Sequence, residues 1–451
     1  MKKDTIAAIA TAMTNSGIGI VRISGTEAFD IIQKVYRGKT LKDHSIHYGY
    51  IVDGEDTIDE VLVMFMKGPH SFTGEDTIEI NCHGGVYVVK RILETVIKYG
   101  ARPAEPGEFT KRAFLNGKMD LSQAEAVIDI ISSQNEYALK SSVNQLKGNV
   151  HKKINEIREQ ILYHTAFIET ALDDPEHISV DGYGETLKIT VETLLKDIKD
   201  LLLSADNGRI IKEGIKTVIV GKPNAGKSSL LNALVGEERA IVTDIEGTTR
   251  DVLEETIQLQ GITLNVIDTA GIRKTDDVVE KIGVSKAKEQ VNEADLIIYV
   301  VDASRELDQN DFEIIEMIRD KKAIVLLNKS DLLTVVSKDM LQSYLKQPMI
   351  EISAKEETGI KELEKYVKKL FFKGELSFND QIYITNVRHK AALQDAYESL
   401  EKVINSIENG MPEDFYSIDL LDAYESLGSI TGETIGEDLV NEIFSKFCMG
   451  K

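Results

Sequence analysis

Thiols are scarce in this chain, which has only two cysteines, Cys82 and Cys448, among its 451 residues. So few thiols argue against a disulfide framework and against a cysteine-based zinc site, and they favour a reducing, cytoplasmic location. Long apolar runs are also missing, because the longest ones, such as Leu296 to Val301, have only the length of a buried strand. The sequence therefore predicts no membrane-spanning helix and no secretory signal.

Basic residues are few as well: 53 Lys and Arg stand against 75 Asp and Glu, a formal net charge of −22. This balance argues against nucleic-acid binding through bulk charge, so any RNA would have to meet a local patch. Residues 1–118 are neutral, with 15 basic and 15 acidic residues, and they contain the cluster Lys111, Arg112 and Lys118. That cluster is interpreted either as a binding patch or as an ordinary solvated face.

Proline is also rare, with 7 residues, and no low-complexity tract occurs, so the chain is expected to fold into two or three globular domains. Short alternating segments predict an α+β domain over 1–118. Helical periodicity predicts helices over 119–213 and again over 374–451, and alternating strands and helices over 214–373 predict a doubly wound α/β module. Helices on both sides of this module indicate that it is inserted in a helical bundle formed by two chain segments.

The start of the first helical segment has a cap signal. Ser122 and Glu125 stand at the spacing of a capping box, just before the apolar residues Val127, Ile128 and Ile131. This spacing predicts a helix that begins at Ser122.

The most specific motif is Gly221-Lys-Pro-Asn-Ala-Gly-Lys-Ser-Ser229, which fits the phosphate-loop pattern GxxxxGK[ST]. It follows the apolar run Ile215 to Val220 and opens a predicted helix from Lys227 to Val235. In such a loop, backbone N–H groups surround the β-phosphate and the lysine, here Lys227, reaches the β and γ oxygens. Ser228 is expected to bind Mg2+.

Three further motifs follow in the order of a guanine-nucleotide site, each at the end of a predicted strand. Asp268-Thr-Ala-Gly271 places a carboxylate near the metal and a backbone N–H near the γ-phosphate. Asn328-Lys-Ser-Asp331 supplies a carboxylate, Asp331, that accepts from two donors on guanine but meets an N1 lone pair on adenine. Ser353-Ala-Lys355 supplies a loop that contacts the base. The ordered set predicts a GTPase.

Over its whole length the chain also resembles the MnmE (TrmE) family of tRNA-modification GTPases. The motifs that carry this resemblance are Gly17-Ile-Gly-Ile-Val-Arg-Ile-Ser-Gly25, Thr73-Gly-Glu-Asp76 with His83-Gly-Gly85, Pro106-Gly-Glu-Phe-Thr-Lys-Arg-Ala-Phe-Leu-Asn116, Gly247-Thr-Thr-Arg-Asp251 and Cys448-Met-Gly-Lys451. One departure is Thr11-Ala-Met-Thr-Asn-Ser16, where the family usually shows a turn rich in Pro and Gly.

The resemblance implies a homodimer whose N-terminal domain binds a tetrahydrofolate derivative, the 5-formyl or 5,10-methylene form. It also implies a flavin-binding partner, MnmG (GidA), with which the enzyme adds a carboxymethylaminomethyl-type group to C5 of the wobble uridine of certain tRNAs. Arg22, Glu79, Lys118 and Lys451 match positions that would bind the folate. This is chemically reasonable because a pterin ring offers donors to a carboxylate and the glutamate tail suits cations.

For GTP hydrolysis, the residue after the Asp268 motif is Ile272, whose apolar side chain cannot orient water as the glutamine of Ras-like enzymes does. By resemblance, Glu280 orients the water through a second water. K+ takes the place of an arginine finger, on Asn224, Thr243, Ile245 and Thr248, while Thr249 joins Ser228 on Mg2+. Arg250 and Arg273 remain alternative fingers. The G domains would meet face to face across the dimer.

The residues predicted to act on GTP fall into four groups: Asn224, Ala225, Gly226, Lys227, Ser228 and Ser229; Thr243, Asp244, Ile245, Glu246, Gly247, Thr248 and Thr249; Asp268, Thr269, Ala270 and Gly271; and Asn328, Lys329, Asp331, Ser353, Ala354 and Lys355. Lys227 and Glu280 are the predicted catalytic residues. Cys448 is a third candidate, either as a nucleophile or, with no role, as a small buried hydrophobic residue.

A regulatory GTPase of ribosome assembly, or another RNA-linked switch, is the alternative function. Such a protein normally carries a second GTPase domain or a basic RNA-binding module. The tail from Glu375 onward has 15 acidic and 5 basic residues, which is not typical of that module. Retention of folate by residues 1–118 would separate the two functions.

Overall fold

The computed structural model describes residues 4–179, 182–239, 254–259, 261–267, 290–372, 382 and 384–450. The chain forms two compact units. The first contains Met1–Ser132, Ser142–Lys196 and Ala392–Lys451, and the second contains Ser133–Ser141 and Asp197–Ala391. Among the described residues, no helix has the length and apolar character that crossing a membrane requires.

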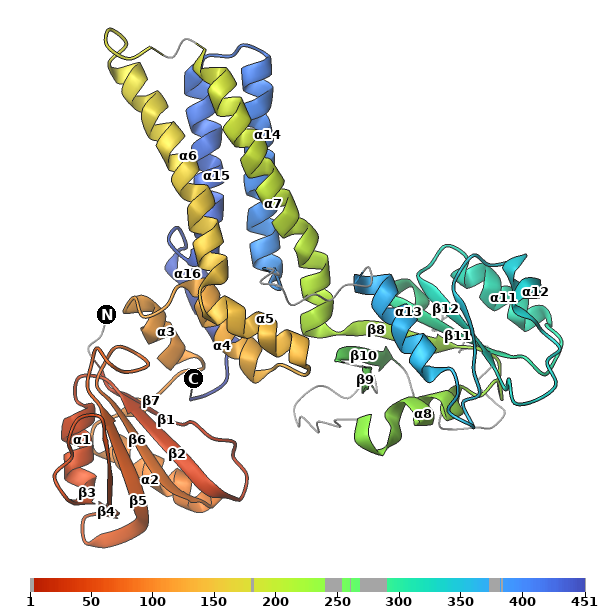
Figure 1. Ribbon diagram of the computed structural model, residues 1–451. Helices are drawn as coiled ribbons and strands as arrows, with labels where there is room; N and C mark the ends of the chain where they lie inside the picture. The colour runs from red at the N-terminus through yellow and green to blue at the C-terminus, as the bar shows by residue number, and fades with distance from the viewer. Residues whose placement is uncertain are drawn as a thin grey trace. The chain divides into compact units, whose positions relative to one another are not determined.

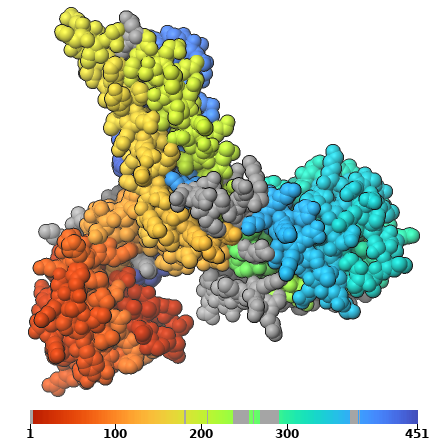
Figure 2. Space-filling model, in the orientation of Figure 1, coloured from red at the N-terminus to blue at the C-terminus, as the bar shows by residue number. Residues whose placement is uncertain are grey.

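The first unit begins with a seven-stranded sheet. Its strands are β1 (Ile6–Ile9), β2 (Ser16–Ser24), β3 (Tyr36–Gly38), β4 (Ser45–Asp53), β5 (Asp56–Met66), β6 (Thr77–Gly84) and β7 (Arg102–Pro103). They lie in the order β3-β4-β5-β6-β2-β1-β7, and every neighbouring pair is antiparallel except β1 and β7. Strands and helices both occur within residues 4–118, as the α+β prediction expects. In the space-filling view the red and orange atoms of this part form one continuous packed body (Figure 2).

Two helices cover one face of this sheet, and on part of the other face Ile6 and Ala8 pack with Phe109 and Phe72. Alternate strand residues such as Val21, Ile23 and Ile80 are buried against α1 (Ala28–Val35) and α2 (Val86–Lys98). The residues between them point to the opposite face, because side chains alternate along a strand. Arg22 and Glu79 are therefore on the face that these helices leave open.

Helices α3 (Glu108–Leu115) and α4 (Leu121–Ile131) follow the sheet. The predicted capping box was placed wrongly: Asp120 is the N-cap of α4, and its carboxylate accepts from the backbone N–H of Gln123, whose side chain in turn accepts from the N–H of Asp120. Ser122 is instead buried and donates to Asp120. An Asp two residues earlier competes for the same backbone donors, and as a charged acceptor it makes the stronger hydrogen bond.

Further helices complete the first unit. Three lie wholly in it: α6 (Asn149–Asp173), α15 (Glu413–Thr431) and α16 (Glu437–Ser445). Three others, α5 (Glu136–Leu146), α7 (Tyr183–Glu213) and α14 (Val387–Glu408), are divided between the two units. Helices from both ends of the chain lie side by side, α6 against α15 and α7 against α14, where Lys188 of α7 pairs with Glu408 of α14 at 2.7 Å (Figure 1). Apolar residues at helical spacing, such as Ile154 and Ile161, face this shared core.

The second unit contains a six-stranded sheet. Its strands are β8 (Ile215–Val220), β9 (Glu254–Leu259), β10 (Ile262–Ile267), β11 (Leu296–Asp302), β12 (Ala323–Asn328) and β13 (Met349–Glu351), and they lie in the order β13-β12-β11-β8-β10-β9. All pairs are parallel except β9 with β10. The strands predicted from apolar runs are confirmed.

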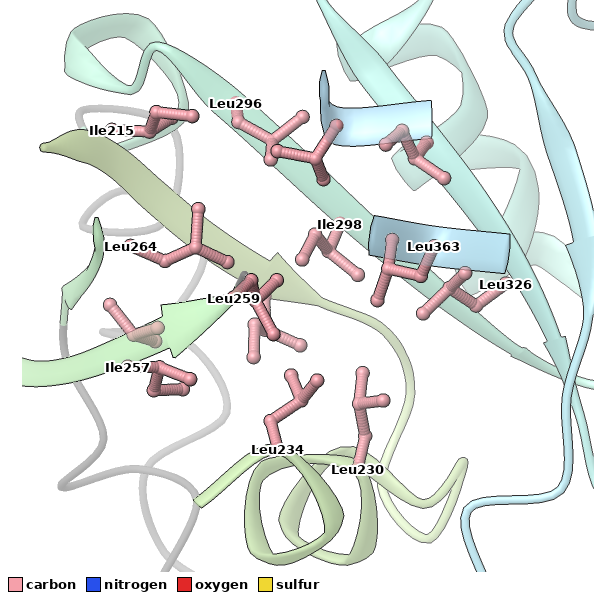
Figure 3. Close-up of a cluster of buried hydrophobic side chains, with 14 of the residues drawn as sticks. Ile215, Leu230, Leu234, Ile257, Leu259, Leu264, Leu296, Ile298, Leu326 and Leu363 are labelled. Carbon is pink, nitrogen blue, oxygen red and sulfur yellow. The ribbon is translucent and has the colours of Figure 1, made fainter. Parts of the chain in front are cut away.

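Helices cover both faces of this sheet. Side chains of α8 (Lys227–Arg239) and α13 (Ile360–Phe372) share one apolar cluster with alternate strand residues, and Figure 3 shows Leu230 and Leu234 of α8 pointing toward the strands. On the other face, strand residues such as Tyr299 pack with α11 (Gln309–Ile318) and α12 (Lys338–Gln342). This is the doubly wound arrangement that the sequence predicts, and it brings the carboxyl ends of β8, β11, β12 and β13 to one edge.

Candidate functional site

The phosphate loop leaves the carboxyl end of β8 and opens α8. Its backbone takes left-handed torsion angles at Gly221, Asn224 and Gly226, with φ of 152°, 62° and 98°. A Cβ at Gly221 would lie 2.4 Å from the carbonyl oxygen of Val300, and one at Gly226 would lie 2.1 Å from Asn328 Nδ2. Only glycine fits these two positions, because the loop passes so close to β11 and β12.

Lys227 lies across this loop. Its Nζ donates to the carbonyl oxygens of Gly221 at 2.7 Å and of Lys222 at 2.8 Å. Burial lowers the pKa of Lys227, because the surroundings disfavour the charged form. Among the described residues no carboxylate pairs with this ammonium, so an arriving phosphate would supply the opposite charge.

Asn328 ties the phosphate loop to the base loop, residues 353–355. At the end of β12 it is 2% exposed; its Nδ2 donates to the Ala225 carbonyl at 2.8 Å, and its Oδ1 accepts from the Ala354 N–H at 3.0 Å. The sequence predicts nucleotide contact for Asn328 and does not reveal this bracing role. The signal that could have shown it is a polar residue that ends a fully apolar strand.

Asp331 is held by the loop that follows β13. Ser353 Oγ donates to Asp331 Oδ1 at 2.6 Å, and this hydrogen bond lowers the pKa of Asp331. The carboxylate therefore stays ionised and can accept from the donors of guanine. Lys329, two residues before it, has a left-handed backbone with φ of 67°.

Other predicted nucleotide residues are placed only in part. Ser228 and Ser229 lie at the start of α8, where a hydroxyl oxygen is a suitable hard ligand for Mg2+. Among the described residues, no group of three or more His, Cys, Asp or Glu could hold a metal. The remaining predictions lie outside the described residues: Thr243 to Thr249, Arg250, Asp268 to Gly271, Ile272, Arg273 and Glu280.

A second constellation lies on the open face of the first sheet. Arg22 of β2 and Glu79 of β6 are register partners, and the Arg22 Nε and Nη2 atoms both lie 2.8 Å from Glu79 Oε1. The guanidinium also lies over the rings of Phe72 and Phe109, at 5.8 and 5.6 Å from their centroids. The structure thus joins two of the predicted folate residues in an aromatic-lined, half-buried ion pair.

The carboxyl end of the chain reaches this pair. Arg22 Nη1 donates to the carbonyl oxygen of Gly450 at 3.2 Å, and the carbonyl of Cys448 accepts from the N–H of Gly107 at 3.3 Å. Lys451 is outside the described residues. Lys118 donates to the Pro69 carbonyl at 3.0 Å, in the loop that also carries Phe72.

Two interpretations of the sequence are corrected by the structure. Arg112 is neither a binding patch nor a solvated face: it is 8% exposed and pairs with Asp4 at 2.7 Å and with Glu75 and Glu108 at 3.1 Å. The spacing of charges along the sequence did not reveal that three carboxylates would surround it. Cys448 is not a small buried residue, because its side chain is exposed.

The family models and the curated relatives match almost the whole chain. A family model described as the GTP-binding protein TrmE N-terminus matches residues 5–118, and one described as the MnmE helical domain matches residues 121–448. A tRNA modification GTPase MnmE of Lachnoclostridium phytofermentans is 60% identical over 100% of both chains. One of Clostridioides difficile is 50% identical over 99% of each. The solved G domain of the T. maritima FeoB iron transporter aligns with 35% of this chain and 98% of its own, at 27% identity and a TM-score of 0.27.

Proposed function

Because this chain belongs to the MnmE family of tRNA modification GTPases, we propose that it couples GTP hydrolysis to a folate-dependent modification of the wobble uridine. The GTPase acts in tRNA modification, with Mg2+ as its metal. With a flavin-dependent partner of the MnmG type, it adds a carboxymethylaminomethyl-type group at C5, from a tetrahydrofolate one-carbon donor.

The observation that carries the GTPase half is the hydrogen-bonded edge of the second sheet. Asn328 fixes the phosphate loop to the base loop, and Ser353 positions the ionised Asp331 by donating a hydrogen bond to it. A guanine base donates to that carboxylate from N1–H and from its amino group, while Lys227 leaves the loop carbonyls for the phosphates. Ser228, with Thr249, would hold Mg2+, which supplies positive charge to the β and γ oxygens.

K+ is proposed as the second cation. Asn224 is exposed in the phosphate loop, so its side-chain oxygen is accessible to an ion. Thr243, Ile245 and Thr248, which lie outside the described residues, would supply backbone carbonyls as the other ligands. The ion's charge offsets the charge that develops between the β- and γ-phosphates, and Glu280 orients the attacking water. The G domains are proposed to meet face to face across the homodimer.

The folate half is supported by the Arg22–Glu79 pair on the open sheet face. Glu79 can accept from a pterin, and the glutamate tail of the cofactor suits Lys118 and Lys451. Cys448 lies in the same carboxyl-terminal segment and is exposed, so it can reach a substrate. The proposed domains are 1–118 for folate and dimerisation, 214–373 for GTP as an insertion, and 119–213 with 374–451 for the helical bundle.

The experiment that tests the proposal is GTP hydrolysis by the purified chain in K+ and in Na+ at matched ionic strength. We expect strong activation by K+, lost in Asn224→Ala, because the amide side chain is the ion's only proposed side-chain ligand. Asn310→Ala, on α11, is the matched control and should keep the activation. Equal rates in the two salts would overturn the K+ mechanism and direct attention to Arg250 and Arg273.

A further inference from the structure

We propose that Asp302 and Asp311, two buried carboxylates outside the nucleotide motifs, are positioning residues that hold the loop of residues 328–331 and the phosphate loop in place. This inference rests on the proposed GTP site. Asp302 ends β11 and is 7% exposed, and Asp311 lies in the first turn of α11 and is 1% exposed. Each carboxylate binds one lysine from one of the two loops.

Asp311 holds the phosphate loop through Lys222. The Lys222 Nζ lies 2.6 Å from Asp311 Oδ2 and 2.9 Å from Asp308 Oδ2. Asp311 is itself fixed from two directions: its Oδ1 accepts from the hydroxyl of Tyr299 at 2.9 Å, and its Oδ2 accepts from the N–H of Asp308 at 3.0 Å. Tyr299 is fully buried in β11, so the sheet itself anchors this carboxylate.

The consequence reaches the catalytic lysine. The carbonyl of Lys222 is one of the two that Lys227 contacts, so fixing the Lys222 side chain also fixes part of the loop wall. Two carboxylates balance the charge of Lys222 and turn its ammonium toward α11. Lys227, and not Lys222, is therefore the lysine of this loop that we expect to bind the phosphates.

Asp302 holds the loop of residues 328–331 through Lys329. Its Oδ2 lies 2.5 Å from the Lys329 Nζ, and its Oδ1 accepts from the N–H and hydroxyl of Ser304 at 3.1 and 2.6 Å. Burial alone would raise the pKa of Asp302, but the hydrogen bonds from Lys329 and Ser304 lower it, so the carboxylate is charged. The ion pair is thus intact at neutral pH.

Lys329 needs such a restraint because its backbone is left-handed, with φ of 67°, a conformation that costs energy for any residue with a Cβ. The N–H of Ser330 bonds to the carbonyl of Ile352 at 3.0 Å, and Asp331 follows directly. Without the ion pair, Lys329 can relax toward an ordinary conformation and move Asp331 away from Ser353. Asp302 therefore positions the Asp331 carboxylate, which reads guanine, through Lys329.

The segment of residues 302–311, from the end of β11 to the first turn of α11, contains both of these carboxylates. Its start is fixed in the sheet, since the Ala303 N–H bonds to the Asn328 carbonyl at 2.9 Å, and its end is fixed by the capping box of Asp308 and Asp311. The two anchors predict different defects. Loss of Asp311 should weaken phosphate binding whatever the base, whereas loss of Asp302 should weaken the choice of base.

The test measures dissociation constants of GDP and IDP, whose base lacks the 2-amino group, for the full chain and four variants: Asp302→Asn, Asp311→Asn, Asp320→Asn and Lys227→Ala. Asp311→Asn should weaken both nucleotides by about tenfold and keep their ratio, because one charged hydrogen-bond partner of the loop is lost. Asp302→Asn should weaken GDP by about tenfold and IDP by less, so the ratio falls. Asp320, exposed just after the end of α11, controls for charge and should change neither.

Two further measurements make the outcome decisive. In a Lys329→Met background, Asp302→Asn should have no further effect on the two dissociation constants, because Asp302 contacts the loop of residues 328–331 through that lysine. In a Lys222→Met background, Asp311→Asn should likewise have no further effect. Thermal unfolding without nucleotide separates these effects from misfolding. If Asp311→Asn does not fold, Tyr299→Phe is the alternative, because it removes one hydrogen bond to Asp311 and keeps the carboxylate. Independent, additive effects or an unchanged ratio in Asp302→Asn would overturn the inference. Unimpaired GDP binding by Lys227→Ala would instead overturn the proposed site.

Discussion

The hydrogen bond from Ser353 to Asp331, at 2.6 Å, shows how one side chain sets nucleotide choice at the scale of a single residue. An ionised carboxylate only accepts hydrogen bonds, and guanine offers it two donors. A neutral amide in its place would present a donor to the guanine amino group. The same amide would suit xanthine, which carries a carbonyl at that position.

Asp331→Asn is therefore expected to raise the KM for GTP by about 100-fold, since two hydrogen bonds to a charged group are lost, and to improve the use of XTP. Steady-state hydrolysis of both nucleotides measures the change. Asp339→Asn, an exposed carboxylate in the first turn of α12, is the matched control. A variant that still prefers GTP over XTP would show that Asp331 does not read the base.

At the scale of an element, the phosphate loop depends on its close approach to β12. Gly226 has a φ of 98°, and a Cβ there would lie 2.1 Å from Asn328 Nδ2. Gly226→Ala should push Asn328 away from the Ala225 and Ala354 backbone groups, so both loops shift together. We expect the affinity for GDP to fall by at least about tenfold, with about 1–2 kcal/mol of added backbone strain.

Gly410→Ala is the control for that strain. Gly410 also has a left-handed backbone, with φ of 62°, but no atom lies within 4 Å of a Cβ built there. Isothermal titration with GDP should therefore give normal affinity for Gly410→Ala. Equal losses in the two variants would assign the defect to backbone strain in general and not to the contact with Asn328.

The open sheet face of the first unit shows the same dependence between elements. Residues far apart in the chain, Arg22 and Gly450, meet there at 3.2 Å. Removing residues 448–451 should lower the affinity for 5-formyltetrahydrofolate by about tenfold, because Arg22 loses a partner and the site loses a wall. GTP hydrolysis serves as the internal control and should remain. Unchanged folate affinity would show that residues 448–451 are not part of the folate site.

At the scale of the whole molecule, acid stability follows from the ion-pair cluster of the first unit. Burial alone would raise the pKa of Glu108, but hydrogen bonds from Arg102, the Glu105 N–H and Arg112 lower it overall. Burial likewise opposes the lowering of the Asp4 pKa, which Arg102 and Arg112 bring about. A pKa below that of the unfolded chain means that the contribution is complete above the unfolded value and is lost as pH falls.

We therefore expect the first unit to lose stability below about pH 4.5, and Glu108→Gln to reduce both the stability at pH 7, by about 1–3 kcal/mol, and its dependence on acid. Hydrogen exchange of peptides from residues 4–118 measures this locally, from pH 7 to pH 3. Glu94→Gln, exposed on α2, should behave like the unchanged chain. A steeper acid dependence in Glu108→Gln would mean that the Glu108 pKa is raised by folding and not lowered.

Several features followed from the sequence by itself. Apolar runs of strand length, ended by Gly221, Asn328 and Ser353, were enough to place β8, β12 and β13, because strand burial and turn chemistry are local properties. The nucleotide motifs predicted GTP from the sequence as well, because each motif follows a strand that is recognisable locally and their order along the chain is that of a guanine-nucleotide site. The helical bundle was also visible, since Leu393, Ala396 and Leu400 repeat at helical spacing.

The tertiary structure decided which distant groups meet. It put Asp4, Glu75 and Glu108 around Arg112, carried Gly450 to Arg22, and gave Asn328 a bracing role between loops. It also moved the N-cap of α4 from Ser122 to Asp120. Such pairings depend on how strands and helices pack across long sequence separations, and a side chain's charge or polarity does not specify its partner until the fold brings the two together.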